Sequence, residues 1–245
     1  MTKVAVITGG GSGIGRAAGR KLAAAGWRVV LAGRRQAALD EAAAAHPGLI
    51  PMVADVTDEA AVQRLFDETV KRCGRVDLLF NNAGMFPPAA PVPDVALADF
   101  TAALAVNVTG MFLCARAAFR VMQAQSPQGG RIINNGSISA HTPRPGSAHY
   151  TASKHAVTGL TKSISLDGRA FGIACGQIDI GNAATSMTKA MTAGVPQADG
   201  RMAVEPRMDV DDVGRSILFM ASMPLDTNVQ FLTVMATNMP FIGRG

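Results

Sequence analysis

The chain has 245 residues, of which 48% are hydrophobic, 17% are charged and 26 are glycine. A disordered chain would be poorer in apolar residues, and a collagen-like or disulfide-stapled chain would be richer in glycine or cysteine, so these classes are excluded. The net charge is +5, but the basic residues are scattered and aromatic residues make up only 5%, which does not favour a nucleic-acid partner. We expect a compact soluble protein with a single domain over residues 1–245.

Cysteine usage and hydropathy indicate the cytoplasm. Cys73, Cys114 and Cys175 are odd in number, lie far apart and form no CxxC pair or cluster with the four histidines. This pattern favours a reducing compartment over a disulfide framework or a metal site. The apolar run after Met1 is too short for a signal peptide, and we find no uninterrupted apolar stretch that would span a bilayer. We therefore expect a cytoplasmic protein with no metal and no membrane partner.

Short β-branched segments alternate with longer alanine-rich segments of helical period along the whole chain. Strands are predicted at 3–8, 28–32, 50–54, 76–80, 131–135, 174–178 and 230–235. Helices are predicted at 13–25, 36–45, 58–73, 99–123, 149–171 and 209–222. This order predicts an α/β fold of three layers, doubly wound, in which a mostly parallel sheet of seven strands is covered by helices on both faces.

Local signals mark several ends of these elements. Pro47 and Gly48 end the second helix, Thr57 is a predicted N-cap of the third, and Asp209 is a predicted cap of the last. The segment 181–207 contains several glycines, prolines and methionines and is hard to assign to a helix or a strand. We predict a functional lid there, with a plain surface excursion as the alternative.

A glycine-rich turn follows the first predicted strand and leads directly into a helix. It reads Thr8-Gly9-Gly10-Gly11-Ser12-Gly13-Ile14-Gly15. Glycines let the backbone turn tightly and approach a pyrophosphate, whose charge is met by amide N–H groups and by the positive end of the helix. Its position between strand and helix favours a dinucleotide site over a simple turn. Cofactor contacts are predicted at Gly9, Gly11, Ser12, Gly13, Ile14 and Gly15.

The end of the second strand bears on the choice between NADP(H) and NAD(H). A site for NAD(H) normally has an acidic residue there, which binds the ribose hydroxyls. This chain instead has Arg34 and Arg35 after Gly33. A small residue followed by arginines leaves room for a 2′-phosphate and supplies charge-assisted donors. We therefore predict a preference for NADP(H), with NAD(H) as the alternative and a solvated loop as the simplest explanation of the arginines.

A serine, a tyrosine and a lysine are spaced in a way that suits proton transfer. Tyr150, the only tyrosine of the chain, follows Ser137 by thirteen residues and precedes Lys154 by four. Residues i and i+4 share one face of a helix, so the phenol and the ammonium point into the same space. A fixed positive charge favours phenolate, which would help the tyrosine exchange a proton with a substrate oxygen. We expect the pKa of Tyr150 to fall below about 10 in the cofactor complex.

Taken together, these motifs resemble the short-chain dehydrogenases/reductases, in the subtype that has one Rossmann domain. The resemblance covers nearly the whole chain. The motifs that carry it are the turn at 8–15, Asp55-Val56, Asn81-Asn82-Ala83-Gly84, Asn107, Ser137 and the Tyr150/Lys154 pair.

The resemblance implies a catalytic tetrad of Asn107, Ser137, Tyr150 and Lys154. Tyr150 would act as general acid in reduction and general base in oxidation, and Ser137 would hydrogen-bond the substrate oxygen. Lys154 would bind the nicotinamide ribose and lower the pKa of the tyrosine, while Asn107 would hold a proton-relay water. Further implied cofactor contacts are Asp55, Val56, Asn82, Ala83, Gly84, Tyr150, Lys154, Gly181, Ala183 and Thr185.

The segment after the sixth strand departs from the family pattern. Relatives usually have a Pro-Gly pair there, whereas this chain has Ile180 before Gly181. Asp179 and Asn182 add polar groups that either lie beside the cofactor or only organise the loop. Substrate contacts are expected from 85–88, from 141–144 and from the predicted lid, where Arg144 would either pair with a substrate carboxylate or phosphate or face water.

The resulting hypothesis is an NADP(H)-dependent oxidoreductase that transfers hydride between the nicotinamide and a small carbonyl or alcohol substrate. Two alternatives remain: the same chemistry with NAD(H), and a non-catalytic protein that senses the cofactor. The family resemblance and the apolar tail at 233–245 also suggest a homotetramer.

Overall fold

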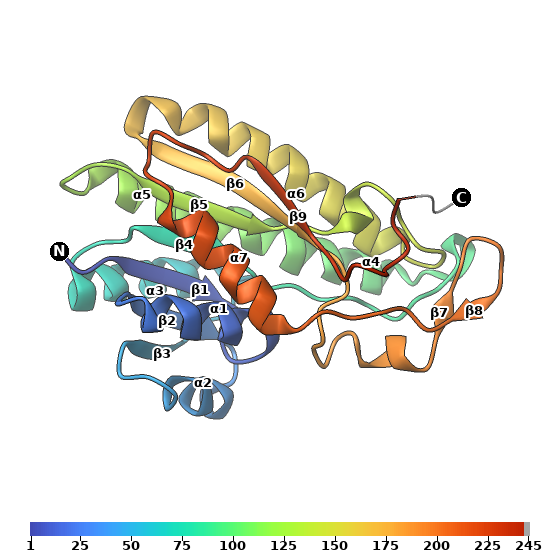
Figure 1. The fold of residues 1–245 in the computed structure, drawn as a ribbon. Helices are drawn as coiled ribbons and strands as arrows, with labels where there is room; N and C mark the ends of the chain where they lie inside the picture. Colours follow the sequence, from blue (N-terminus) through green and yellow to red (C-terminus); the bar gives the residue numbers. More distant parts are fainter. Residues whose placement is uncertain (243–245) are drawn as a thin grey trace.

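The structure, a computed structural model, describes residues 1–242 except for the side chain of Ala190. Its centre is a parallel sheet of seven strands in the order β3-β2-β1-β4-β5-β6-β9 (Figure 1). The strands are β1 (Val4–Thr8), β2 (Arg28–Gly33), β3 (Leu49–Val53), β4 (Leu78–Asn81), β5 (Gly130–Asn135), β6 (Ile173–Ile180) and β9 (Phe231–Val234). The predicted architecture is confirmed, and each strand lies within two residues of its predicted bounds.

Helices cover both faces of this sheet. They are α1 (Gly13–Ala24), α2 (Gln36–Ala43), α3 (Glu59–Cys73), α4 (Leu97–Leu104), α5 (Met111–Ala124), α6 (Ala148–Asp167) and α7 (Val210–Ser222). Neighbouring strand residues alternate between the two cores, so Ile7 packs with α1 and α7 while Val6 packs with α3 and α5. Strands β1 and β4 are neighbours although β2 and β3 lie between them in sequence. In open α/β sheets, such a reversal opens a crevice at the carboxyl ends of the strands.

The fourth predicted helix is continuous but contains a π-helical turn. Between α4 and α5, residues Ala105–Gly110 (η2) form a π-helix that includes Asn107. By length and composition alone, the whole stretch Leu97–Ala124 is apolar enough to cross a membrane, and it is the one such helix among the described residues. This finding qualifies the prediction that no stretch would span a bilayer. It is a weak sign, because core helices meet the same criterion and α5 packs against the sheet.

Two predicted details are corrected. The N-cap of α3 is Asp58, whose carboxylate accepts the Ala60 and Ala61 N–H groups, whereas Thr57 donates its N–H and hydroxyl to Asp55. The last predicted helix turn before β6 is a separate 3₁₀ turn, η4 (Arg169–Phe171). The prediction for Asp209 is confirmed, because its carboxylate accepts the Asp211 N–H at the start of α7.

The segment predicted as a lid is more regular than its sequence suggests. It contains a short 3₁₀ helix, η5 (Lys189–Thr192), and a hairpin of β7 (Val195–Pro196) and β8 (Met202–Ala203). Its two ends are joined by backbone hydrogen bonds of 2.8 Å, from Met208 N to Asn182 O and from Ala184 N to Met208 O. The segment is therefore a closed loop on a fixed base; whether it acts as a lid stays a prediction.

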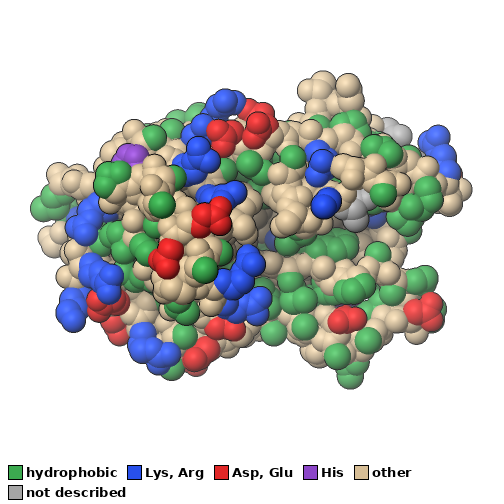
Figure 2. Space-filling model, turned by 90° about the horizontal axis from the view of Figure 1, so that it is seen from below, with side chains coloured by type: hydrophobic (Ala, Val, Ile, Leu, Met, Phe, Trp, Pro, Cys, Tyr) green, Lys and Arg blue, Asp and Glu red, His purple; other side chains and the backbone are tan. Residues whose placement is uncertain are grey.

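Surface charge is mixed on the face shown in Figure 2. Lys and Arg side chains lie among Asp and Glu side chains, and hydrophobic side chains gather toward the right, on the side where β7 and β8 lie in Figure 1. No continuous basic area is visible on that face.

Candidate active site

The glycine-rich turn between β1 and α1 has a geometry that only glycine satisfies at three positions. Gly9 and Gly13 have positive φ values of 66° and 50°. A Cβ atom on Gly15 would lie 2.4 Å from the carbonyl oxygen of Gly9, so no side chain fits between the turn and the helix. The first turn of α1 has no acidic residue, and the Ser12 hydroxyl does not cap it. The helix N-terminus therefore presents its amides to the cleft, as anion sites require.

Neutral hydrogen bonds join this turn to the end of β4. The Thr8 hydroxyl accepts the backbone N–H groups of Asn82 and Ala83, both at 2.9 Å. The Asn82 side chain donates to the Thr8 carbonyl at 2.9 Å and accepts from the Asn135 side chain at 3.0 Å. Asn82 thus acts first as an organiser of the turn, linking the ends of β1, β4 and β5. The sequence analysis did not identify Asn135, and the one feature that could have indicated it is its position as the last residue of a predicted strand.

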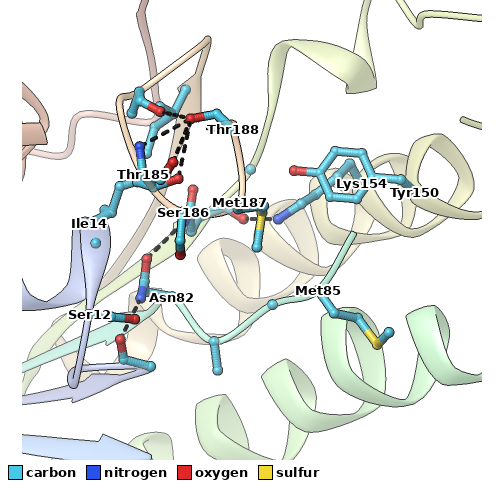
Figure 3. A pocket seen from close by; sticks show the side chains of 18 of the residues that line it. Ser12, Ile14, Asn82, Met85, Tyr150, Lys154, Thr185, Ser186, Met187 and Thr188 are labelled. Carbon is cyan, nitrogen blue, oxygen red and sulfur yellow. Dashed lines mark hydrogen bonds between the residues drawn. The ribbon is translucent and has the colours of Figure 1, made fainter. Parts of the chain in front are cut away.

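One cleft runs from this turn to Tyr150 (Figure 3). It brings together most of the predicted site residues, from both sides of the reversal in strand order. The predicted residues that line it are Gly9, Ser12, Gly13, Ile14, Asn82, Ala83, Gly84, Tyr150, Lys154, Gly181, Ala183 and Thr185. It is also lined by Met85, Ser186, Met187 and Thr188, from two of the segments expected to contact the substrate, and by Asn135, Gly136 and Ile180, for which no contact was predicted. Gly11 and Gly15 do not line the cleft; they allow Ala38 and Gly9 to approach closely.

The residues predicted to bind the adenosine end lie apart from this cleft, at the ends of β2 and β3. Arg34 and Arg35 are exposed and form no ion pair within the described residues. Asp55 is partly buried, and hydrogen bonds from Thr57, aided by the charge of Arg34, lower its pKa against the effect of burial. Val56 is buried. Arg34 and Asp55 thus influence each other at the edge of the sheet, where a second part of a dinucleotide would extend.

Tyr150 and Lys154 project from α6 into the cleft (Figure 3). Lys154 is buried, its Nζ donates to the Asn135 carbonyl at 2.7 Å, and it lies 5.5 Å from the centroid of the Tyr150 ring. Burial lowers the pKa of Lys154 to about 8, although the charge of Asp179 acts to raise it. Burial also raises the pKa of Tyr150, against opposing effects of a hydrogen bond with Ser137 and of Arg144. The lowered tyrosine pKa, which concerns the cofactor complex, stays a prediction.

Ser137 and Asn107 complete the predicted tetrad, and both are buried. Ser137 Oγ accepts the Ser139 N–H at 3.1 Å, which leaves the hydroxyl proton available for donation. The Asn107 side chain accepts the Met85 N–H at 2.8 Å and donates to Met85 O and Ser153 Oγ at 3.0 Å. Its side chain is therefore engaged with the protein itself, and it fixes the segment that carries Met85.

The segment 85–88 lies over Tyr150, as predicted for a substrate wall. The Phe86 ring centroid is 4.6 Å from that of Tyr150 and 6.1 Å from that of His149. His149 is buried, its Nδ1 accepts the Tyr150 N–H, and its Nε2 lies 3.0 Å from the Pro88 carbonyl. Because Nδ1 accepts a hydrogen bond, Nε2 carries the proton and donates a hydrogen bond to the Pro88 carbonyl.

A buried ion pair joins the loop before α6 to the predicted lid. Arg144 pairs with Glu205, and Arg144 also donates to Asn182 Oδ1 at 2.8 Å. Asn182 and Gln197 donate to Glu205 at 2.8 and 3.1 Å. Burial alone would raise the pKa of Glu205, but the hydrogen bonds from Arg144, Asn182 and Gln197 outweigh it and lower that pKa. Arg144 therefore does not face water, which corrects one of its two predicted roles, and a contact with a substrate anion stays a prediction.

Asp179 is the second buried carboxylate near the cleft. Its side chain is 1% exposed, and it accepts the Ser137 N–H at 2.9 Å and the Gln177 side chain at 2.7 Å. Its other oxygen lies 3.0 Å from Nε2 of His141. The sequence showed Asp179 only as a departure from a family pattern, and its partners 38 and 42 residues away carried no signal.

The end of the cleft after β6 is closed by threonines and by the C-terminal segment. Thr185 and Thr188 hydrogen-bond each other, with Thr188 Oγ1 3.1 Å from the Thr185 amide (Figure 3). A Cβ atom on Gly181 would lie 2.7 Å from Met235 and 2.8 Å from the Met239 sulfur. Glycine is thus retained here, although Ile180 replaces the usual proline. Among the described residues, no group of three or more His, Cys, Asp or Glu side chains is placed to hold a metal ion.

The parallel sheet, the glycine turn at its reversal and the cleft between them define a dinucleotide-binding α/β protein. A profile of the short chain dehydrogenase family matches residues 3–196. The chain is 34% identical over 241 residues to sulfoacetaldehyde reductase 2 of Chromohalobacter salexigens, covering 97% of this chain and 95% of that protein. It is 33% identical over 228 residues to meso-2,3-butanediol dehydrogenase of Serratia marcescens, covering 90% and 87%.

Solved structures show the same likeness. The fold matches 3-ketoacyl-(acyl-carrier-protein) reductase from Brucella melitensis complexed with NADH, with a TM-score of 0.85, 27% identity and coverage of 96% of this chain and 98% of that one. It matches levodione reductase with a TM-score of 0.86, 27% identity and coverage of 95% and 96%. The chain belongs to the short-chain dehydrogenase/reductase family, and it is an oxidoreductase that acts on alcohol or carbonyl groups with NAD(P)(H).

Proposed function

We propose that this protein is an NADP(H)-dependent carbonyl/alcohol oxidoreductase in which Tyr150 is the acid/base. The observation that carries the proposal is the position of Tyr150: its ring centroid lies 5.5 Å from Lys154 Nζ, and Ser137 is close enough to lower the pKa of the phenol. Tyr150 and Lys154 line the end of the cleft opposite the glycine turn, and Ser137 follows Gly136, which also lines the cleft. A proton donor, a second hydrogen-bond donor and a fixed cation then meet where a substrate oxygen would lie.

The shape of the turn fits the cofactor. Side chains at Gly9, Gly13 or Gly15 would meet Asn82, Thr185 or the backbone of Gly9 within 3.2 Å, so the backbone itself forms the floor of the cleft. The amides of the α1 N-terminus suit the pyrophosphate, and Gly11, Ser12 and Ile14 belong to the same turn. Gly84, Gly181, Ala183 and Thr185 line the cleft toward Tyr150 and are proposed to surround the nicotinamide end.

Each residue of the proposed tetrad has its own part in the reaction. The nicotinamide, when bound, supplies or accepts the hydride. Tyr150 donates its proton to the carbonyl oxygen in reduction and accepts it in oxidation. Ser137 donates a hydrogen bond to the same oxygen. Its Oγ accepts the Ser139 N–H, and this bond leaves the hydroxyl proton available for donation. Lys154 uses one of its three N–H donors on Asn135, which leaves two for the ribose hydroxyls. Asn107 supports this arrangement, and its part in a water relay is untested.

The protonation state of Tyr150 suits the acid half of this role. Burial raises the pKa of the phenol, which therefore carries its proton at neutral pH in the protein alone. A protonated phenol is ready to act as the acid in carbonyl reduction.

The preference for NADP(H) rests on the end of β2. Gly33 ends the strand where an acidic residue would bind a ribose, and Arg34 and Arg35 follow it, exposed and without an ion pair among the described residues. Asp55 and Val56 lie nearby and are proposed to flank the adenine. A structural neighbour is complexed with NADH, so NAD(H) is the alternative that direct binding measurements must exclude.

The decisive experiment is Tyr150→Phe. Turnover of NADPH with a panel of aldehydes and ketones should fall at least about 1,000-fold, because the variant has no acid at the reacting oxygen. NADPH affinity, followed by nucleotide fluorescence, should stay within about threefold, since the phenol contributes little to cofactor binding. Retained turnover would refute the role of Tyr150. Tight NADPH binding by the parent without turnover on the whole panel would instead support the cofactor-sensing alternative.

We further propose a single-domain, cytoplasmic homotetramer whose segment 181–207 acts as the lid over a small substrate. Exposed apolar side chains on α5 and α6, such as Phe112 at 44% and Leu166 at 59%, support association through these helices. Of the apolar tail, residues 243–245 lie outside the described residues. Light scattering at micromolar concentration would show a monomer if the association is wrong.

A further inference from the structure

Asp179, at the end of β6, is a buried carboxylate that the proposed chemistry leaves without a role. Its Oδ1 accepts the Ser137 backbone N–H at 2.9 Å and the Gln177 amide at 2.7 Å, and its Oδ2 lies 3.0 Å from His141 Nε2. Both oxygens are therefore bound, and one of the bonds reaches the backbone of the proposed catalytic serine.

Ser137 and His141 are the two ends of one short turn. The 3₁₀ turn η3 (Ile138–Ala140) has Ser137 as its N-cap and His141 as its C-cap residue. The turn is closed by the bond from Ala140 N to Ser137 O at 2.9 Å. The carboxylate of Asp179 thus binds the turn at both ends. A five-residue segment held in this way has little freedom to move the serine hydroxyl away from Tyr150.

The carboxylate reaches the turn because the intervening residue has no side chain. A Cβ atom on Gly136 would lie 2.1 Å from Asp179 Oδ1 and 2.6 Å from the Gln177 amide nitrogen. Glycine before the serine, aspartate on the neighbouring strand and histidine after the turn therefore form one spatial unit. Residue pairs on β5 and β6 bring them together, because Asn135 lies opposite Ile178 in the parallel register.

A charge on the buried Asp179 carboxylate also needs a partner of opposite charge or a hydrogen-bond donor. Within the described residues, His141 is the one basic side chain within ion-pair distance of Asp179, and its side chain is 47% exposed while that of Asp179 is 1% exposed. The other titratable groups that face Asp179 are Tyr150 and Lys154 on α6, both of which feel its charge. His141 therefore connects a buried carboxylate beside the reacting groups to the solvent.

We propose that Asp179 is a positioning residue for Ser137, and that His141 is the partner which holds the carboxylate in place. This inference rests on the proposed function, because it concerns the serine that would bind the substrate oxygen. Asp179 touches neither the substrate oxygen nor the proposed cofactor contacts directly; it acts through the backbone and the turn that carry Ser137.

The first test uses kinetics and removes the carboxylate in two ways. Asp179→Ala should lower kcat about 100-fold with little change in NADPH affinity, because the buried Ser137 N–H loses its acceptor. Asp179→Asn should restore kcat to within about tenfold of the parent, because an amide oxygen still accepts from Ser137. In a Ser137→Ala background, Asp179→Ala should cost less than about threefold more, since the residue being positioned has already lost its hydroxyl. If the double variant instead loses kcat by the product of the two single losses, the proposal is overturned.

The matched control is Asp77→Asn. Asp77 also accepts a backbone N–H, from Val4 at 2.8 Å, and pairs with a basic side chain, Arg75 at 2.8 Å, but it lies before β4, at the amino-terminal ends of the strands and away from the cleft. Its kcat should stay within about twofold of the parent. A kcat loss as large as that of Asp179→Ala would show that removing any such carboxylate has this effect, and would overturn the proposal.

The second test needs no turnover and separates this inference from the proposed function. Because Tyr150 is the only tyrosine, its ionisation is followed by ultraviolet absorbance without background. Asp179→Asn and Asp179→Ala both remove the same negative charge, but only Asp179→Ala also releases Ser137, which lowers the pKa of the phenol in the parent. That pKa should therefore be higher in Asp179→Ala than in Asp179→Asn, and Asp77→Asn should leave it unchanged. Equal values in the two Asp179 variants would overturn the inference. Absence of turnover in the parent would overturn the proposed function, and the titration would still decide whether Asp179 positions Ser137.

Discussion

The two walls of the cleft are held in place by different chemistry. On the glycine-turn side, neutral groups do the work: the Thr8 hydroxyl accepts two amides and the Asn82 side chain joins three strand ends. On the side after β6, buried charges do it, through Asp179 with His141 and Glu205 with Arg144. The stability contributed by neutral hydrogen bonds depends little on pH. The stability contributed by buried charges depends strongly on pH and requires a specific partner for each charge.

The difference between the two walls matches the different parts of the site that they are proposed to form. We propose that the neutral wall faces the cofactor, and a glycine turn is enough to build it. We propose that the charged wall faces the substrate end; its contacts join the segment 141–144 to Asp179 on β6 and to the segment 181–207. Its contacts are formed by side chains far apart in sequence, so it can change without disturbing the cofactor wall.

Breaking the charged wall should give the largest loss of stability. Arg144→Met leaves Glu205 buried without its cation, and we expect the free energy of unfolding to fall by about 3 kcal/mol. In the parent, the lowered pKa of Glu205 means that this contribution is present above the unfolded pKa of about 4.5 and is lost as pH falls through the lower folded value. Urea denaturation between pH 3 and pH 7 would measure both effects, and an equal loss at every pH would contradict this assignment.

A matched control for the charged wall is Lys21→Met. Lys21 and Asp211 form an ion pair of 2.8 Å between α1 and α7, with side chains 28% and 39% exposed. An ion pair in contact with water contributes little, so we expect a loss below about 1 kcal/mol. A loss as large as that of Arg144→Met would show that burial is not what distinguishes the two pairs.

The neutral wall should respond to shape and not to charge. In Gly15→Ala, the new methyl group would overlap the Gly9 carbonyl, so we expect a loss of about 2 kcal/mol in the free energy of unfolding and at least tenfold weaker NADPH binding, with no dependence on pH. Gly159 in α6 has no atom within 4 Å of an added Cβ, so Gly159→Ala should stabilise the protein by about 0.5 kcal/mol. Unchanged NADPH affinity in Gly15→Ala would contradict the role of the turn.

The edge of the neutral wall should determine which cofactor binds. Arg34→Ala combined with Arg35→Ala should weaken NADPH binding about tenfold and leave NADH binding unchanged, because only NADPH carries the 2′-phosphate. Arg64→Ala combined with Lys71→Ala removes the same charge from exposed positions on α3 and should change neither affinity. Tighter binding of NADH than NADPH by the parent would favour the NAD(H) alternative.

The smallest expected effect is a shift in the ionisation of Tyr150, which lies between the two walls. In the protein alone, its pKa should exceed the ordinary value of about 10, because burial disfavours the phenolate. In the complex with NADP⁺ we expect a lower value, because the charge of Lys154 acts more strongly once water has left the cleft. Ultraviolet titration with and without the cofactor measures the shift, and a higher value in the complex would put the role of Lys154 in doubt.

Much of the fold could be predicted from the sequence, because strands with β-branched runs and helices with a regular apolar period can be recognised from short contiguous segments. The cofactor wall followed as well, since a glycine turn after a strand is a short contiguous motif. Cap assignment was less secure: both Thr57 and Asp58 can cap a helix, and the sequence alone did not show that Thr57 would bond Asp55.

The charged wall could not be predicted, because pairs such as Arg144 and Glu205 lie 61 residues apart and either residue alone is typical of a surface. The regular parts of 181–207 were missed for a related reason. Strands of two residues are too short to show a period, and β7 and β8 are held by pairing with each other.

The π-helical turn at Ala105–Gly110 sets the phase of everything that follows it in that helix. A π turn contains one residue more than an α turn, so it rotates the next segment by roughly 100° relative to an uninterrupted α-helix. Closing this turn into regular α bonding without removing a residue would rotate the buried face of α5, with Cys114 and Ala118, away from the sheet, whereas deleting one residue would let a regular helix keep that face in place. The π turn therefore lets this helix contain one additional residue while its buried face stays against the sheet.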